Sequence, residues 1–313
     1  MKNIKITISK AVAGSFLLLL TALSTEMKAQ LNPLAGLYFQ NQYMGNPAMA
    51  GIDEGLNLNL GYRQQWSLIP GAPVTQSLTA DYGTGKKVGL GLNIHNDEAG
   101  LIKRTRVMGT YSYHLPLNDD GQKLRFGLSL GFMDDRVMNE NINGDMNDIS
   151  VSKFNQRETY IDGDFGLAYT GNKLTIQAAI PNLKGFLQKE TLNATADRSS
   201  FFSAVSYKFY FPKTLDGFGV EPKLALRGVQ GFENIFDAGA NFTVANRAAS
   251  VMAIYHSSES ATIGLGANIK SLGAINANYT TATSALSGYT SGEFQIGLKL
   301  NVFKPKQEEY QAD

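Results

Sequence analysis

The side chains in this sequence that could most readily do chemistry are three histidines, His95, His114 and His256. None has a second ligand at a spacing that metal sites use, and the chain has no cysteine. A hydrolase triad needs a hydroxyl, an imidazole and a carboxylate that converge in space, and the many serines make a chance match easy to assemble. We therefore expect no enzyme, no metal and no cofactor, and we interpret the histidines as strand residues.

A second candidate is a run of oxygen-bearing residues that resembles the first part of a calcium loop. The residues are Asn139, Asn141, Asn143, Gly144, Asp145 and Asn147. The twelfth position should be a bidentate glutamate but is Ser150, and most of the ligands would be amides. The run is better interpreted as an external loop that offers a contact surface, with Ile149, Val151 and Phe154 as its apolar contacts.

The elements that would position these residues are β-strands, because apolar and polar residues alternate with period two. Leu56, Leu58, Leu60 and Tyr62 share one face of a strand, and Asn57, Asn59, Gly61 and Arg63 share the other. Fourteen stretches of this kind are predicted. They are 55–66, 73–82, 87–96, 105–115, 123–133, 158–169, 173–180, 200–211, 219–228, 235–245, 248–256, 261–269, 273–281 and 293–303.

The connections between these strands favour a membrane barrel over a soluble sandwich. The links after the second, sixth, tenth and twelfth strands are tight, whereas those after the fifth, seventh and thirteenth are long, at about 134–157, 181–199 and 281–292. Outer-membrane barrels have short periplasmic turns, longer external loops and an even strand number. We therefore predict an all-β, 14-stranded antiparallel up-and-down transmembrane β-barrel with both termini in the periplasm.

The chain divides into four predicted parts. Residues 1–29 have the basic start and short apolar run of an export signal peptide, and the apolar run is too short to span a bilayer. Residues 30–54 form an N-terminal segment without clear period, expected in the barrel lumen or at its periplasmic mouth, with an extended leader as the alternative. Residues 55–303 form the barrel, and residues 304–313 form a charged periplasmic tail.

The predicted lumen would be wide and polar. Fourteen strands lie between the 8 of filled barrels and the 16 to 18 of open porins. Six charged residues are predicted to face inward, either as cross-strand pairs or as the selectivity filter of a diffusion channel: Arg125, Asp162, Asp164, Glu221, Lys223 and Arg227. Trp66, the only tryptophan, fits an anchor at the bilayer interface. The net charge of +1 argues against a nucleic-acid partner.

Several short motifs, taken in order, resemble the PorP/SprF family of outer-membrane proteins from Bacteroidota. The motifs are Asn46-Pro47-Ala48-Met49-Ala50-Gly51, Tyr62-Arg63-Gln64-Gln65-Trp66, Gly71-Ala72-Pro73-Val74-Thr75, Val88-Gly89-Leu90-Gly91-Leu92, Asn96-Asp97, Gly100 and Tyr111-Ser112-Tyr113. The residues that carry the resemblance are Asn46, Pro47, Gly51, Arg63, Trp66, Pro73, Gly89, Gly91, Asp97 and Gly100. The resemblance covers essentially the whole chain after the signal peptide.

The resemblance implies a 14-stranded barrel of the type IX secretion system, which serves gliding motility in some members. Its implied partners are outer-membrane lipid, periplasmic ring or peptidoglycan-linked components, and a secreted adhesin that stays on the cell surface. No catalytic residue comes with it. The leading hypothesis is a non-enzymatic scaffold that anchors periplasmic machinery or a surface protein. A porin-like diffusion channel and an outer-membrane hydrolase are the alternatives.

Overall fold

The computed structural model describes residues 36–66, 71–138, 159–187, 200–215, 217–229, 233–269, 273–283 and 290–303. The chain divides into two compact units, Met1–Gln30 and Leu31–Asp313, and every described residue belongs to the second. The predicted signal peptide, the calcium-like run and the charged tail lie outside the described residues.

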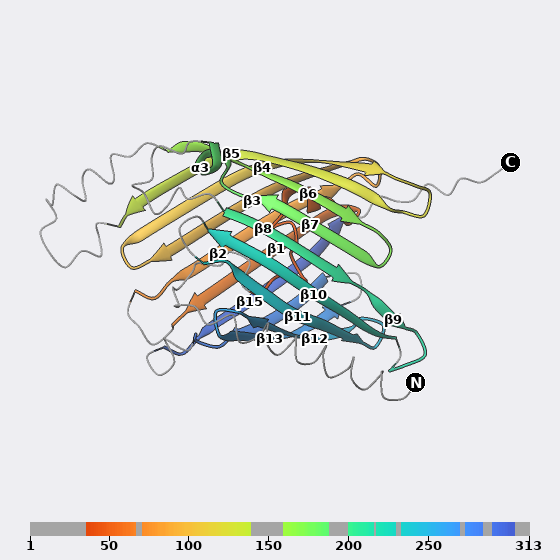
Figure 1. Ribbon diagram of the computed structural model, residues 1–313. Coiled ribbons are helices and arrows are strands. Elements are labelled where there is room, and N and C mark those ends of the chain that lie inside the picture. The colour runs from red at the N-terminus through yellow and green to blue at the C-terminus, as the bar shows by residue number, and fades with distance from the viewer. Residues whose placement is uncertain are drawn as a thin grey trace, which may run out of the picture. The chain divides into compact units, whose positions relative to one another are not determined.

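The second unit is a closed antiparallel β-barrel, as predicted (Figure 1). Each strand pairs with its neighbours along the chain, and β15 pairs with β1 to close the sheet. The strands are β1 (Gly55–Gln65), β2 (Val74–Gly83), β3 (Val88–Ala99), β4 (Ile102–Pro116), β5 (Lys123–Val137), β6 (Tyr160–Thr170), β7 (Leu174–Ile180), β8 (Ser200–Tyr207), β9 (Phe209–Phe211), β10 (Phe218–Val229), β11 (Ile235–Val244), β12 (Ala249–His256), β13 (Ser260–Ile269), β14 (Gly273–Thr280) and β15 (Glu293–Phe303).

The fifteen labelled strands make up fourteen strands of the barrel wall, because β8 and β9 are two parts of one wall strand with a short interruption. Both pair with β10 in one continuous register, which runs from Ser206 opposite Lys223 to Phe209 opposite Val220. Pro222 lies in β10 within that gap and has no N–H to donate to the ladder. The predicted strand 200–211 is therefore a single strand of the wall, and the gap in its pairing with β10 contains Pro222.

The two faces of the sheet differ as the period-two pattern predicts. On the outer face Leu60 is 45% exposed and Leu265 is 62% exposed, whereas the inward-facing Asn57 is only 3% exposed. The sheet is closed, so no strand edge is left unpaired around the barrel wall, and its outer face is apolar. A bilayer requires both properties. Among the described residues, no helix is long and apolar enough to cross a membrane.

The links differ in part from the predicted alternation of short and long. We call the end with the β2–β3, β4–β5 and β6–β7 links the turn end, and the opposite end the loop end; the turn end is the predicted periplasmic side. At the loop end, Gly100 and Leu101 alone separate β3 from β4. Gly100 has a φ of 60°, a left-handed conformation that favours glycine in so tight a turn. β5 also runs to Val137, so the long link predicted from residue 134 begins later.

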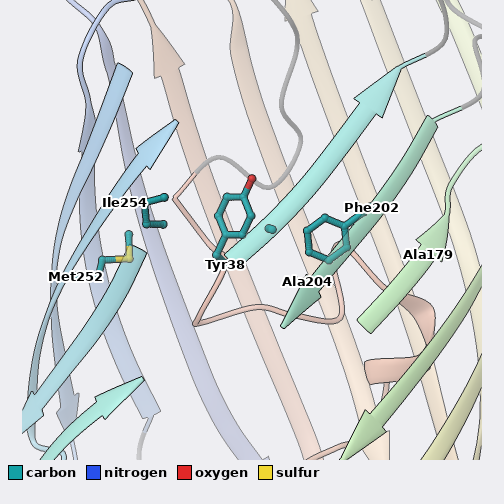
Figure 2. Packing of buried hydrophobic residues seen from close by; sticks show 7 residues of the cluster. Tyr38, Ala179, Phe202, Ala204, Met252 and Ile254 are labelled. Carbon is teal, nitrogen blue, oxygen red and sulfur yellow. The ribbon is translucent and has the colours of Figure 1, made fainter. Parts of the chain in front are cut away.

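Residues 36–54, which we call the inner segment, lie inside the barrel. The segment contains one 3-10 turn, η1 (Pro47–Met49), which packs against β4, β5 and β6. Tyr38 lies among inward side chains of the wall, with Met252 and Ile254 on one side and Phe202 and Ala204 on the other (Figure 2). A short helix, α3 (Leu183–Leu187), follows β7 and contacts β6 at the loop end.

Candidate functional site

The inner segment and the wall that holds it form the candidate functional site, and the ten motif residues divide between this site and the loop end. Five of them lie at the contact between segment and wall: Asn46, Pro47, Gly51, Gly89 and Gly91. The other five lie where β1, β2 and β3 reach the loop end: Arg63, Trp66, Pro73, Asp97 and Gly100. Sequence order alone does not reveal this division, because the two groups interleave along the chain.

The Asn46-Pro47 pair builds the turn at the centre of the inner segment. Asn46 is fully buried and caps η1, since its Oδ1 accepts a hydrogen bond from the Ala48 N–H at 2.9 Å. Pro47 occupies the first position of η1, where its missing N–H costs nothing. The Asn46 side-chain amide also donates to the Leu167 carbonyl oxygen of β6 at 3.2 Å. The turn is therefore fixed internally and tied to the wall by one residue.

Glycines of the barrel wall allow the inner segment to lie in close contact with the wall. Gly83, Gly89, Gly127 and Gly166 come from β2, β3, β5 and β6, and none has room for a side chain. A Cβ would overlap Asp53 O at Gly83, Ala50 O at Gly89, Ala48 N at Gly127 and Asn46 Oδ1 at Gly166. At Gly91 a Cβ would instead meet the Tyr43 hydroxyl. These strand glycines let two backbones touch, and we call this contact the glycine anchor.

Polar groups of the same wall satisfy the backbone of the inner segment. The Ser112 hydroxyl donates to the Ala48 carbonyl oxygen at 3.1 Å, and Gly51 N–H donates to Asp81 Oδ2 at 3.1 Å. Arg125 donates to His114 Nδ1 at 2.8 Å. Because a guanidinium has no acceptor, this bond places the imidazole proton on Nε2, which donates to the Ala50 carbonyl oxygen at 3.1 Å.

A second anchor lies on the opposite stretch of wall and works through side chains. The Tyr38 hydroxyl donates to Asp237 Oδ2 at 2.6 Å. The same carboxylate accepts from Arg227 Nε at 2.8 Å and meets His256 Nδ1 at 2.6 Å. Burial raises the pKa of the Tyr38 phenol above its ordinary value, so the phenol stays protonated as a donor. We call Tyr38, Asp237, Arg227 and His256 the tyrosine anchor.

Further contacts hold the first half of the inner segment. Lys223 Nζ donates to the Tyr38 carbonyl oxygen at 2.6 Å and lies 4.7 Å from the centre of the Phe39 ring. The other bonds join Asn41 to Thr79 at 3.0 Å, Gln42 to Gln177 at 2.6 Å, Tyr43 to Thr110 at 2.7 Å and Gly36 to Gln295 at 2.9 Å. Their partners come from β2, β4, β7 and β15, so the segment touches the wall on many sides.

The six predicted inward charges do face the interior, but only some pair with an opposite charge. Arg227 pairs with Asp237, and Asp164 pairs with Arg106. Lys223 and Arg125 instead donate to the inner segment and to His114. Charges on this wall are thus used partly for cross-strand pairs and partly to hold the inner segment.

The five motif residues at the loop end fix the strand ends. Asp97 accepts from Thr75 and from His95, and Arg63 lies 3.5 Å from Glu293. The other three act through their backbones: Trp66 N–H donates to Gly292 O at 2.8 Å, Gln65 N–H donates to Pro73 O at 2.9 Å, and Gly100 N–H donates to Gly71 O at 2.9 Å. Trp66 is half-buried with a φ of 49°, a rare backbone conformation for a bulky residue.

In a comparison with known families, residues 27–300 match the model described as "Type IX secretion system membrane protein PorP/SprF". The chain belongs to this family. The resemblance drawn from the motifs is confirmed, and the match extends far beyond the N-terminal third where those motifs lie. This PorP/SprF protein is an outer-membrane β-barrel, and its family is one of secretion-system membrane proteins rather than of enzymes.

Several solved structures are similar to this PorP/SprF protein at low sequence identity. One is Omp33 of Acinetobacter baumannii, with 9% identity, 80% of this chain and 99% of that chain covered, and a TM-score of 0.45. Another is a mutant porin of Rh. blastica, with 10% identity, 79% and 99% covered, and a TM-score of 0.34. A third is BamA of Haemophilus ducreyi lacking POTRA domains 1-3, with 10% identity, 79% and 70% covered, and a TM-score of 0.40. No curated protein matches the chain.

One group of residues in the PorP/SprF barrel has the composition of a hydrolase triad. His256 meets Asp237 through Nδ1 and the Thr262 hydroxyl through Nε2, the latter at 2.8 Å. Thr262 is only 1% exposed, and its hydroxyl also bonds Thr280 at 2.7 Å. The hydroxyl of the group is therefore buried, and its Asp237 and His256 belong to the tyrosine anchor. Among the described residues, no group of three or more His, Cys, Asp or Glu could hold a metal ion.

Sequence reasoning singled out the glycine anchor in part and missed the tyrosine anchor. Asn46, Gly89 and Gly91 were found through the family motifs, whereas Tyr38 and Asp237 carry no motif and lie 199 residues apart. A signal was available in hindsight: Arg227 was predicted to face inward, and a buried arginine requires a carboxylate near it. The sequence does not say which one.

Proposed function

We propose that this PorP/SprF protein is a non-enzymatic scaffold of type IX secretion whose lumen is closed by the inner segment. In this proposal the barrel anchors periplasmic machinery through its turn end and termini, or holds a secreted surface protein through its long loops. We also propose that residues 1–29 are removed on export and that the tail 304–313 stays in the periplasm. A role in gliding belongs to the version that holds a surface adhesin.

The observation that supports a closed scaffold is that the inner segment is held from two sides of the wall. Leu37, Tyr38 and Tyr43 are at most 5% exposed, and Ala48 and Met49 are fully buried. A segment that only passed through an open channel would keep its polar groups in water. Here Asn46 and Tyr38 bond the wall instead.

Planar-bilayer recording tests the closed lumen. Wild type should show no steady conductance, and deletion of residues 30–54 should produce one, because a 14-stranded barrel is wider than the barrels that side chains can fill. The matched control is a deletion of the tail 304–313, which should leave the bilayer silent. Steady conductance of wild type would favour the diffusion channel, the second candidate function, which the charged inward side chains motivate.

The two versions of the scaffold make different demands on the long loop between β5 and β6. Removal of residues 139–158 spares both strands and should release a surface adhesin into the medium if the loops hold it. Secretion itself should continue, since the turn end is intact. Unchanged retention of the adhesin on the cell surface would remove the loop version and leave the periplasmic one.

A further inference from the structure

A cavity opens at the mouth of the barrel on the turn end. It measures about 670 Å³ and is formed by the β2–β3 turn together with the adjoining ends of β4 and β5. Lys86, Lys87 and Lys123 line it, together with Val88, His114 and Pro116. A volume of this size is in the range of pockets that hold a small ligand or a few residues of a peptide, about 300 to 1,000 Å³.

The three lysines lack the ion pairs that some other cations in the described part of the barrel form. Lys103 pairs with Glu98 at 2.8 Å, and Lys299 pairs with Asp53 at 2.5 Å. By contrast, Lys86, Lys87 and Lys123 form no ion pair with any described residue. Three unneutralised ammonium groups around one cavity attract an anionic ligand.

The carboxylates near this cavity do not neutralise it. Glu54 lies beside Gly85 in the β2–β3 turn, and Asp119 and Asp120 are exposed in the β4–β5 link. None of the three lies within ion-pair distance of the cavity lysines among the described residues. The positive charge of the cavity is thus open to an outside partner.

The position of the cavity favours a peptide over a membrane lipid. His114 faces the interior, is only 3% exposed, and bonds the inner segment at Ala50. One wall of the cavity therefore belongs to the inner face of the barrel, where the bilayer does not reach, and His114 links that wall to the inner segment. An occupant must enter from the water at the turn end.

We propose that this basic mouth, defined by Lys86, Lys87 and Lys123, receives an extended acidic segment of a periplasmic protein. The inference rests on the proposed scaffold function, since it places the turn end in the periplasm and gives the barrel a partner there. An apolar contact from Pro116 supplies burial, while the three ammonium groups select for carboxylates and exclude basic peptides.

The test uses fluorescein-labelled hexaglutamate as the probe and full-length mature protein in neutral detergent. At about 0.05 M salt, fluorescence anisotropy should show saturable binding, and about 0.5 M salt should weaken it because exposed charges are screened. A triple variant, K86E/K87E/K123E, should weaken binding by about tenfold, the size expected when several exposed charge pairs are lost. Hexaglutamine should not bind wild type.

A matched control carries the same charge change outside the cavity. Lys173, Lys208 and Lys213 are exposed at the same end of the barrel and do not line the cavity. K173E/K208E/K213E should change the affinity for hexaglutamate less than about twofold. Equal losses in the two triple variants would show a diffuse charge effect and overturn the proposal. Absence of saturable binding to wild type would overturn it as well.

Two further arms separate the alternatives. Soluble short-chain phosphatidylglycerol that binds with the same dependence on the three lysines and displaces hexaglutamate would assign the mouth to a lipid headgroup and overturn the peptide. A second variant, K86Q/K87Q/K123Q, serves as the control for misfolding of the first. An unchanged heat-dependent shift in gel mobility shows that its barrel is folded. Because scaffold function is read by secretion and conductance, failure of peptide binding leaves it standing.

Discussion

The glycine anchor and the tyrosine anchor hold the same inner segment by different physical means. At the glycine anchor the backbone of residues 46–51 lies on wall positions that have no side chain. At the tyrosine anchor one phenol reaches a buried carboxylate that also serves Arg227 and His256. The first anchor depends on shape, so added atoms should break it. The second depends on polar partners, so removed atoms should break it.

Because the two anchors work by different means, we expect that each end of the inner segment can be released without the other. Because the chain has no cysteine, a single introduced thiol reports local exposure without background. Leu37→Cys places the reporter beside the tyrosine anchor, and Met49→Cys places it at the glycine anchor, at sites that are 3% and 0% exposed. Reaction of the thiol with a water-soluble maleimide then shows which of the two anchors has released the inner segment.

The largest effect is expected for Asp237→Ala. The change leaves the Arg227 guanidinium, the Tyr38 hydroxyl and His256 without their shared partner, and breaking a buried pair of this kind costs about 3 to 5 kcal/mol. The thiol at position 37 should become reactive while that at position 49 stays protected. Asp119→Ala, in an exposed link, is the control and should change neither rate. Equal exposure at both positions would show that the anchors are not independent.

The next effect is expected for Gly127→Val, which adds atoms where Pro47 and Ala48 touch the wall. Overpacking of this kind costs about 1 to 3 kcal/mol, and a strand position in β5 accepts valine readily. The thiol at position 49 should react first, which is the reverse of the pattern for Asp237→Ala. In Gly109→Val, the control, the nearest atom to a Cβ is Leu130 O at 3.8 Å, so both reporters should stay protected.

Much of the barrel was predictable from the sequence, because each strand follows a local rule, the alternation of apolar and polar residues. Alternation along a strand fixes which side chain meets lipid, and the strand from Gly55 to Gln65 shows the pattern that the sequence predicts. The tight β3–β4 turn was harder to predict from the sequence. β3 and β4 continue into a polar stretch around Asp97 and Arg104, and such a polar stretch is typical of a loop. There cross-strand ion pairs, such as Arg104 with Asp135 at 2.7 Å, replace apolar alternation.

The site was predictable only where a motif reports it. Gly89 and Gly91 look like ordinary strand glycines, and their purpose emerges only when the inner segment lies against them. The tyrosine anchor joins residues that lie 199 positions apart in the sequence, and no periodicity links Tyr38 to Asp237. Local rules therefore found the wall, but they could not choose the contacts across the lumen.

A smaller effect is expected for Tyr38→Phe, which keeps the ring against Phe202 and removes only the hydroxyl. Asp237 retains Arg227 and His256, so the cost should be near that of one ordinary hydrogen bond, about 1 kcal/mol. The maleimide rate at position 37 should rise by about fivefold to tenfold, well below the rise for Asp237→Ala. A rise as large as that for Asp237→Ala would mean that the phenol, and not the carboxylate network, carries the anchor.

The smallest effect is expected for Asn46→Ala at the glycine anchor. Loss of a side-chain cap on a helical turn costs about 1 kcal/mol, and here Pro47 still presets the backbone while Ser112 and His114 still bond the carbonyls. Besides the Ala48 N–H, which loses its acceptor, only the Leu167 carbonyl loses a partner. The thiol at position 49 should react slightly faster, and Asn46→Asp should restore the cap but not the bond to Leu167. If Asn46→Ala opened the lumen as fully as Gly127→Val, the anchor would depend on that side chain rather than on the flat wall beneath it.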